Sequence, residues 1–262
     1  MSLSSGVLKD KVCVVTGAAK SIGYGIAKKY AEQGAIVALV DIDPLVIESA
    51  KELADKGYKA IGFIQDITKR DEVLSLFDEI IDTMGDIYCL VNNAGVVDQR
   101  PFEENLEEHF EKIYKVNVYA TAWCIQGVLS CMKRNKSGKI INFSSKSGKT
   151  GSALMVPYSS AKGAIITMTQ ALAYELAPFN INVNCVCPGI TDDTGVWGNV
   201  SEGYIKNLKM EREQVVKEFS AKIPLKRLAS IDDIVDYVFF LTVSGDYCTG
   251  QALNITGGRE MH

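Results

Sequence analysis

Three residues that can hold or move a proton follow one another in the second half of the chain: Ser145, Tyr158 and Lys162. Tyr158 and Lys162 are four residues apart, so on a helix their side chains share one face. A lysine ammonium beside a phenol lowers the pKa of the phenol from about 10 toward neutral pH. The spacing therefore indicates a tyrosine that acts as a general acid or base.

This spacing carries little weight by itself, because the chain contains a second such pair, Tyr24 and Lys28. We interpret that second pair as facing solvent. The order and spacing of all the motifs together, rather than one pair, support proton-transfer chemistry.

The segment Thr16–Gly23 follows an apolar strand, Val12–Val15, and opens a helix. Such a turn lets backbone N–H groups approach a pyrophosphate, and the helix N-terminus favours negative charge. The dinucleotide fingerprint has a third glycine where this chain has Ser21, which is small and can donate a hydrogen bond. The alternative is a glycine turn that binds no ligand.

Asp41 ends the second strand, Ile36–Val40. A carboxylate there can accept both adenosine ribose hydroxyls and would repel a 2′-phosphate, which favours NAD over NADP. Lys20 favours NADP instead, because a basic side chain in the turn could contact the 2′-phosphate. The alternative for Asp41 is a helix N-cap.

Polar residues also follow two later strands. Ser144 and Ser145 come after Lys139–Phe143, and Asn92-Asn93-Ala94-Gly95 begins where Cys89–Val91 ends. The carboxyl ends of parallel strands are where ligands bind in open α/β sheets. Asn117 interrupts a helical pattern, which suggests that its amide has a partner. Each could instead be a structural turn or a satisfied core group.

Short apolar runs alternate with helical periodicity, which predicts an α/β fold: a single-domain Rossmann fold over 1–262 with a doubly wound parallel sheet of about seven strands and helices on both faces. The expected strands are 11–16, 36–41, 59–64, 87–91, 139–143, 181–187 and 251–255. The expected helices are 22–33, 44–56, 70–83, 106–135, 158–177 and 231–243. Residues 191–222 break this pattern and are predicted to form a substrate lid.

Composition excludes several classes of function. The chain has 262 residues, 47% of them apolar, and a net charge of −4 without a basic stripe, so neither disorder nor nucleic-acid binding is expected. No apolar run is long enough for a membrane span, and Met1–Asp10 has no signal-peptide pattern. Seven cysteines in mostly apolar patterns indicate reduced thiols in a cytoplasm. Cys185-x-Cys187, with side chains expected to face opposite ways, and two histidines predict no metal site.

Taken together, the motifs resemble the short-chain dehydrogenase/reductase family from about residue 8 to residue 258. They are Thr16-Gly17-x-x-x-Ser21-Ile22-Gly23, Asp66-Ile67, Asn92-Asn93-Ala94-Gly95, Asn117, Ser145, Tyr158-x-x-x-Lys162 and Pro188-Gly189. The resemblance implies a Rossmann fold, a nicotinamide cofactor and a catalytic tetrad of Asn117, Ser145, Tyr158 and Lys162. In it Tyr158 transfers the proton, Ser145 orients the substrate oxygen, Lys162 holds the nicotinamide ribose, and Asn117 holds a water relay.

The resemblance also implies where the cofactor binds. Asp66 meets the adenine, Asn93 the adjoining ribose region, and Pro188–Ile190 the carboxamide. The family usually has a threonine where this chain has Asp193, so Thr191 and Thr194 are both candidates. The implied cofactor-binding residues are Gly17, Ser21, Ile22, Gly23, Asp41, Asp66, Ile67, Asn93, Ala94, Gly95, Tyr158, Lys162, Pro188, Gly189 and Ile190.

A narrower resemblance, to the sorbitol-6-phosphate dehydrogenase branch, lies in Asn142–Ser152, Ile223–Arg227 and Tyr247–Gln251. Lys146 or Lys149 could face an anionic substrate group there, or both could be solvated loop lysines.

The sequence thus predicts a cytoplasmic NAD-dependent dehydrogenase whose small-molecule substrate is a polyol or sugar alcohol, phosphorylated or not. The alternatives are a 3-oxoacyl reductase, which would prefer NADPH, and a non-catalytic NAD-binding regulator. The family also implies a homotetramer, with helices 106–135 and 158–177 at one interface and Ala252–Met261 near another.

Overall fold

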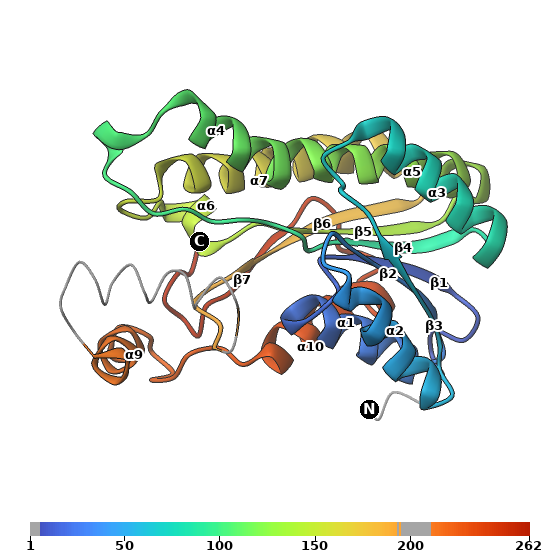
Figure 1. The fold of residues 1–262 in the computed structure, drawn as a ribbon, viewed down its shortest axis with the longest axis horizontal. Coiled ribbons are helices and arrows are strands. Elements are labelled where there is room, and N and C mark those ends of the chain that lie inside the picture. The colour runs from blue at the N-terminus through green and yellow to red at the C-terminus, as the bar shows by residue number, and fades with distance from the viewer. Residues whose placement is uncertain (1–5, 193, 195–210) are drawn as a thin grey trace.

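A computed structural model describes residues 6–192, 194 and 211–262. Within these residues one sheet has the strand order β3-β2-β1-β4-β5-β6-β7, and each neighbouring pair is parallel (Figure 1). The strands are β1 (Val12–Thr16), β2 (Ile36–Asp41), β3 (Lys59–Ile64), β4 (Ile87–Asn92), β5 (Gly138–Phe143), β6 (Ile181–Pro188) and β7 (Ala252–Ile255). The predicted doubly wound parallel sheet is confirmed.

Helices cover both faces of the sheet (Figure 1). One layer consists of α1 (Ser21–Glu32), α2 (Leu45–Asp55) and α10 (Ile231–Val243). The opposite layer consists of α3 (Arg70–Met84), α4 (Glu107–Tyr114), α5 (Ala120–Asn135) and α7 (Val156–Leu176). Shorter helical segments are α6 (Lys146–Thr150), α9 (Arg212–Ala221) and two 3₁₀ turns, Phe102–Glu104 and Ala177–Phe179.

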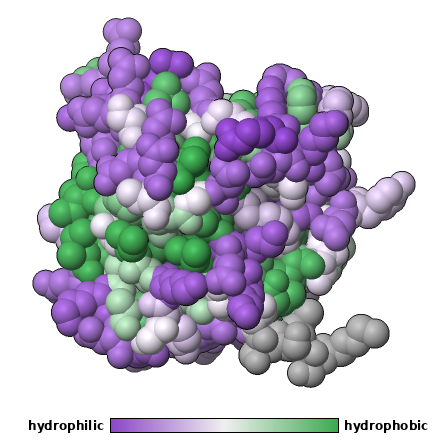
Figure 2. All heavy atoms as spheres, turned by 90° about the vertical axis from the view of Figure 1, so that its right-hand side faces the viewer, coloured by the Kyte–Doolittle hydropathy of each residue, from purple (hydrophilic) through white to green (hydrophobic). Residues whose placement is uncertain are grey.

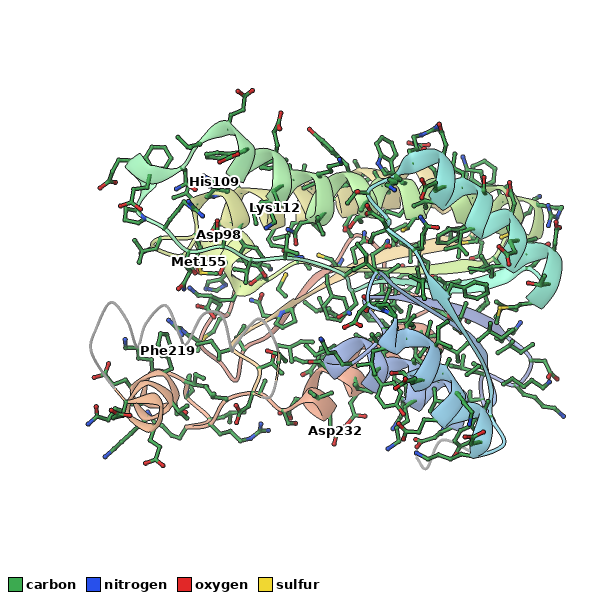
Figure 3. All side chains as sticks on the ribbon, in the orientation of Figure 1. Asp98, His109, Lys112, Met155, Phe219 and Asp232 are labelled. Atoms are coloured by element: carbon green, nitrogen blue, oxygen red, sulfur yellow. The ribbon has the colours of Figure 1, made fainter. Side chains whose placement is uncertain are left out.

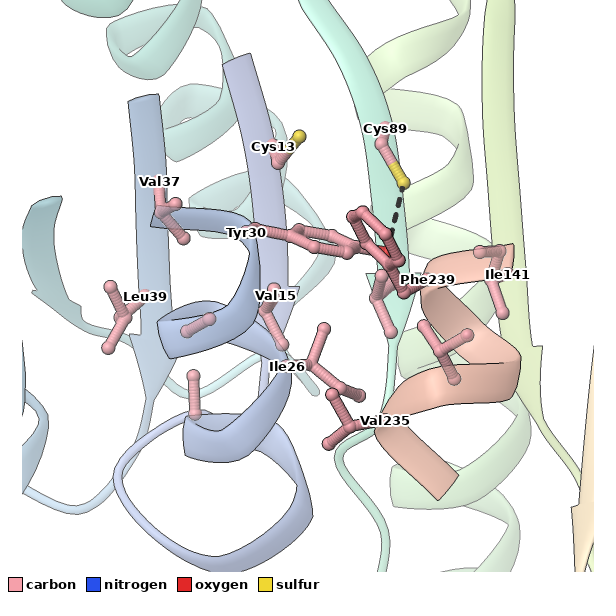
Figure 4. Packing of buried hydrophobic residues seen from close by; sticks show 14 of the residues in the cluster. Cys13, Val15, Ile26, Tyr30, Val37, Leu39, Cys89, Ile141, Val235 and Phe239 are labelled. Carbon is pink, nitrogen blue, oxygen red and sulfur yellow. Dashed lines mark hydrogen bonds between the residues drawn. The ribbon is translucent and has the colours of Figure 1, made fainter. Parts of the chain in front are cut away.

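These two layers explain why the central strands are apolar throughout. Successive side chains of β1 point to opposite faces: Cys13 and Val15 pack toward α1 and α10, whereas Val12 and Val14 pack toward α3 and α5. Figure 4 shows the first of these clusters, in which the hydroxyl of the fully buried Tyr30 lies 3.8 Å from the Cys89 sulfur. Both faces of the central strands are thus closed to water, and the carboxyl edge of the sheet remains for ligands.

The strand order reverses at β1. This strand pairs with β2 on one side and with β4 on the other, so the chain leaves the two halves of the sheet in opposite directions. A crevice forms where the connections diverge, and ligands of open α/β sheets bind there.

One local expectation needs refinement and another is wrong. The helix predicted over 106–135 is helical without a break from Glu107 to Asn135, but a π-helical turn, Lys115–Tyr119, divides it into α4 and α5. Cys185 and Cys187 do not face opposite ways, because residues two apart on a strand share a face; both are buried against Ile165 of α7. Among the described residues, no group of three or more histidine, cysteine or acidic side chains could hold a metal.

The predicted lid over 191–222 lies mostly outside the described residues, and α9 is its described end. On the face shown in Figure 2, hydrophobic residues form a band at mid-height, the level at which Figure 1 places the sheet between its helix layers. In the ranges that the structure describes, no helix is both long and apolar enough to cross a membrane.

Candidate active site

The end of β5 and the start of α7 bring Ser145 and Tyr158 together. Ser145 is the second residue after β5 and caps α6, where its Oγ accepts a hydrogen bond from the Ser147 N–H at 3.1 Å. Tyr158 lies in the first turn of α7, which Pro157 can begin without losing a helical hydrogen bond. The Ser145 hydroxyl lies near enough to Tyr158 to lower the pKa of its phenol.

Lys162 lies one turn after Tyr158 and is only 4% exposed. Its Nζ donates to the Phe143 carbonyl at 2.7 Å and lies 5.7 Å from the centre of the Tyr158 ring. Burial lowers the pKa of Lys162 to about 8, because the ammonium has lost its hydration. The structure therefore holds this cation beside the phenol at an energetic cost.

The surroundings of Tyr158 act on its pKa in opposite directions. In the chain alone burial raises it above its ordinary value, and the neighbouring Ser145 hydroxyl lowers it only in part. The lowering predicted from the sequence involves Lys162 together with a cationic nicotinamide and stays a prediction. In the chain by itself, desolvation of the phenolate therefore outweighs the stabilising groups around it.

Asn117 owes its position to the π-helical turn. Its Nδ2 donates to the carbonyls of Val96 and Ile113, each at 2.9 Å, and this competition with the helical ladder fits the local distortion. Its Oδ1 is buried and has no hydrogen-bond partner among the described residues. A Cβ added to Gly95 would lie 2.7 Å from this oxygen and 3.4 Å from Lys162 Nζ, so the two polar atoms face one small space.

Ser145 and Tyr158 open into a cavity of about 350 Å³. Part of its wall carries hydroxyl groups, from Ser147, Ser152, Thr191 and Thr194. Another part is apolar and includes Met155, which precedes α7, and Phe219 of α9; Figure 3 shows these two side chains approaching from different elements.

A second hollow, of about 980 Å³, follows the carboxyl ends of β1, β2 and β4. His109 and Lys112 of α4, labelled in Figure 3, line it on one side. It joins the cavity through residues that line both, namely Ile22, Asn93, Gly95 and Thr194. The predicted cofactor residues divide between the two hollows: Tyr158, Lys162 and Pro188–Ile190 line the cavity, and Gly17, Ser21–Gly23, Asp41, Asp66, Ile67 and Asn93–Gly95 line the groove.

The turn after β1 fits a pyrophosphate. Gly17 has φ +66°, and a Cβ there would lie 2.9 Å from the Ala94 Cα; a Cβ on Gly23 would lie 2.0 Å from the Gly17 oxygen. Asn93 Nδ2 holds the turn in place by donating to the carbonyls of Thr16 and Gly17, at 3.0 and 3.1 Å. These contacts leave no room for a side chain at Gly17 or Gly23, and a compact turn of this kind at a helix N-terminus suits a phosphate.

Ser21 occupies the position of the missing glycine with φ +58°, in the left-handed region. The backbone therefore keeps the glycine-like conformation although a side chain is present, and a serine there is strained.

Two carboxylates stand along the groove. Asp41 accepts hydrogen bonds from the N–H groups of Ala19 and Asp43, both at 3.0 Å, while Lys20 pairs with Asp43 at 3.3 Å. For Asp66, burial acts to raise the pKa, but hydrogen bonds from Thr68 outweigh it and leave the pKa below its ordinary value.

The two loop lysines differ in the hollows that they line. Lys146 lines both the cavity and a neighbouring hollow beside β7, whereas Lys149 donates to the Ala252 carbonyl at 2.8 Å and lines that hollow but not the cavity. Arg259, in the tail after β7, also lines the cavity, which the sequence reasoning missed. The available signal was a charged pair, Arg259-Glu260, directly after two glycines.

Comparison with known proteins identifies the family. A model described as short chain dehydrogenase matches residues 11–205. The diacetyl reductase, (S)-acetoin forming, of Staphylococcus epidermidis is 35% identical over 253 residues, covering 95% of this chain and 98% of that protein. The sorbitol dehydrogenase of Cereibacter sphaeroides is 32% identical over 257 residues, covering 97% and 99%. The chain therefore belongs to the short-chain dehydrogenase/reductase family.

Solved structures are similar over almost the whole chain. An NAD⁺-bound xylitol dehydrogenase has a TM-score of 0.90 and 29% identity, covering 96% of this chain and 99% of that one. The sorbitol-6-phosphate 2-dehydrogenase of Erwinia amylovora has a TM-score of 0.91 and 30% identity, covering 95% of this chain and 100% of that one. A variant actinorhodin polyketide ketoreductase with NADPH has a TM-score of 0.92 and 29% identity, covering 96% of this chain and 98% of that one. The chain is thus an oxidoreductase of this family with a nicotinamide cofactor, and its resemblance to polyol dehydrogenases is confirmed.

Proposed function

We propose that this chain is an NAD-dependent dehydrogenase of a polyol or sugar alcohol, with Tyr158 as the general base. The hydroxyl-rich cavity into which Ser145 and Tyr158 open carries the proposal. Substrate hydroxyls need hydrogen-bond partners when they leave water, and Ser147, Ser152 and Thr191 can supply them. The similarity to proteins named xylitol dehydrogenase and sorbitol dehydrogenase supports the same substrate class.

The bound nicotinamide supplies the acceptor for the hydride that leaves the carbinol carbon. The Tyr158 oxygen takes the hydroxyl proton, and Ser145 orients the substrate oxygen. Lys162 balances the charge of the phenolate, and the open acceptor Asn117 Oδ1 serves the proton relay. Because burial raises the pKa of Tyr158, alcohol oxidation should become faster as pH rises and carbonyl reduction slower. Rate profiles in both directions would test this; two profiles that rise in parallel would contradict it.

NAD is the proposed cofactor, in preference to NADP. The Asp41 carboxylate is held at the end of β2 beside the groove, where it would bind ribose hydroxyls and repel a 2′-phosphate. Lys20 has Asp43 as a counter-charge, which weakens its attraction for that phosphate. The fifteen groove and cavity residues predicted from the sequence are proposed to bind the cofactor.

Reduction of a 3-oxoacyl group is the second candidate, because Met155 and Phe219 give the cavity an apolar part that suits an acyl chain. A non-catalytic regulator would need the groove but not the neighbouring side chains of Tyr158 and Ser145 in the cavity.

We also propose that the protein is a homotetramer and that it is cytoplasmic. Exposed aromatic side chains beside α5, on α7 and on α10 support further contacts: Tyr119, Tyr174, Tyr237 and Phe240. A monomer by light scattering at micromolar concentration would remove the tetramer.

The deciding experiment is a screen that follows NAD and NADP reduction with free polyols, polyol phosphates, vicinal diols and hydroxyacyl thioesters. We expect turnover with NAD and a polyol. Turnover confined to the thioesters would favour the acyl reductase, and nucleotide binding without any turnover would favour the regulator.

A further inference from the structure

Two cations outside the proposed catalytic tetrad, Lys146 and Arg259, form part of the cavity wall. With Lys162 they give this wall three positive charges, and no aspartate or glutamate lines it in the described part of the chain. A neutral polyol does not require this imbalance. A cavity of one charge sign with poorly hydrated walls attracts a substrate of the opposite sign.

Both cations are placed by ordered structure. Lys146 begins α6 directly after Ser145. Arg259 stands in a tail that folds back on β7, where Glu260 N–H donates to Thr256 Oγ1 and the Glu260 carbonyl accepts from Asn254 Nδ2, both at 3.2 Å. The tail therefore delivers Arg259 to the cavity in a fixed position.

Glu260 forms ion pairs with both cations. Its side chain is 8% exposed, and its Oε1 lies 3.8 Å from Lys146 Nζ and 3.6 Å from Arg259 Nε. All three residues line the neighbouring hollow beside β7, but Glu260, unlike the two cations, does not line the cavity. The carboxylate thus stabilises two like charges side by side while leaving the cavity wall positive.

Lys146 retains donor capacity. Its contacts to the Gly151 carbonyl and to Ser152 Oγ are 3.2 and 3.4 Å, whereas Lys149 and Lys162 make contacts of 2.8 and 2.7 Å. Burial lowers the pKa of Lys146 and the nearby charge of Arg259 lowers it further, while the Glu260 carboxylate only partly opposes them. A bound anion would oppose both effects, because it favours the charged ammonium.

We propose that Lys146 and Arg259 form a subsite for a phosphate monoester carried by the substrate. The inference rests on the proposed function, because it names the substituent on the alcohol that the enzyme oxidises. A guanidinium fork and an ammonium suit the several oxygens of a phosphate. The hydroxyls of Ser147 and Ser152, 2.8 Å apart on the same wall, add donors of the kind that a phosphate accepts. A carboxylate would use fewer of these groups.

The test measures binding before turnover. Calorimetry on the full chain with NAD would compare a free hexitol, its terminal phosphate, the corresponding aldonate and inorganic phosphate. We expect the phosphate ester to bind at least about tenfold more tightly than the free hexitol, since two charge-assisted contacts are gained. Arg259→Gln and Lys146→Gln should each reduce that ratio about tenfold, and Arg259→Lys should restore part of it. Lys149→Gln, outside the cavity, is the matched control and should leave the ratio unchanged.

Arg259→Gln also leaves Glu260 with one cation fewer, so Arg259→Gln/Glu260→Gln separates a lost phosphate contact from a disturbed tail. The double variant should lose the same preference. Equal affinity of the wild type for free and phosphorylated hexitol would overturn the inference. Tighter binding of the aldonate than of the phosphate ester would also overturn it, because the subsite would then be one for a carboxylate. Oxidation of the free hexitol would then still support the proposed function. Phosphate binding that depends on Arg259, without oxidation of any alcohol, would refute the proposed function and keep the subsite.

Discussion

Helices α1 and α7 each carry a tyrosine and a lysine four residues apart, and the two pairs have different surroundings. In α7, Tyr158 is 8% and Lys162 4% exposed, and both line the cavity. In α1, Lys28 is 48% exposed and lies 4.0 Å from Glu32. Tyr24 packs at the edge of a core cluster, where burial and the Glu52 carboxylate raise its pKa to about 12.

The difference comes from the element that each pair faces. The α7 pair faces the end of β5, which supplies the Ser145 side chain and the Phe143 carbonyl. The α1 pair meets acidic side chains of α1 and α2, which oppose a phenolate. A shared helix face makes a proton-transfer pair possible, and long-range partners decide whether the pair can act.

The largest effect is expected when the phenol oxygen of each tyrosine is removed in turn. Tyr158→Phe should reduce kcat about 10²–10⁴-fold, the usual contribution of a general base, while NAD binding remains. Tyr24→Phe should leave kcat within about twofold of wild type, since its surroundings do not favour a phenolate. Steady-state kinetics and NAD titration would measure kcat and NAD binding for both variants. An equal loss of kcat in the two variants would show that the pairs do not differ in function.

A second test compares the lysines through stability. The folded pKa of Lys162 is about 8 against an ordinary value of 10.5, so between these values the unfolded chain binds the extra proton. The free energy of unfolding of wild type, relative to Lys162→Met, should therefore rise from pH 8 to 10.5, by at most about 3 kcal/mol. Below pH 8 the difference should be constant.

Urea denaturation at several pH values would measure this, with Lys28→Met as the exposed control. The relative measurement is needed because buried thiols and phenols act in the opposite direction at alkaline pH. A wild-type difference that does not change with pH would mean that Lys162 keeps its hydration.

A third test concerns what the α1 region contributes instead, namely cofactor choice. Asp41→Asn keeps an oxygen that can accept the Ala19 N–H but removes the charge. We expect the preference of kcat/KM for NAD over NADP to fall about tenfold, because repulsion of the 2′-phosphate is lost. Lys20→Gln is the counter-test and should increase the preference for NAD. If wild type turns over NADP faster at matched subsaturating concentrations, the assignment of Asp41 is wrong.

The same contrast shows what sequence could predict. Local patterns were sufficient for β1 and β2, whose residues are apolar on both faces, and for Asn117, whose amide interrupts a helical pattern. They could not show that Arg259 reaches the cavity, because that requires the tail to fold back along β7. They also could not show the burial that raises the pKa of Tyr158 in the chain alone, since that burial comes from residues distant in sequence.

The smallest expected effect concerns Ser21, at the start of α1. A non-glycine residue with φ +58° is strained by roughly 1 kcal/mol, whereas glycine would lose more freedom on folding by a similar amount. Ser21→Gly should therefore change the free energy of unfolding by less than about 1 kcal/mol, and it should be at least as stable as Ser21→Ala, which keeps the strain. If the serine hydroxyl donates to the cofactor, both variants should weaken NAD binding equally, because both lack it. If only Ser21→Ala weakens NAD binding, the cofactor depends on the backbone conformation at residue 21 and not on the hydroxyl. If Ser21→Gly is less stable than Ser21→Ala, the backbone at this position is not strained.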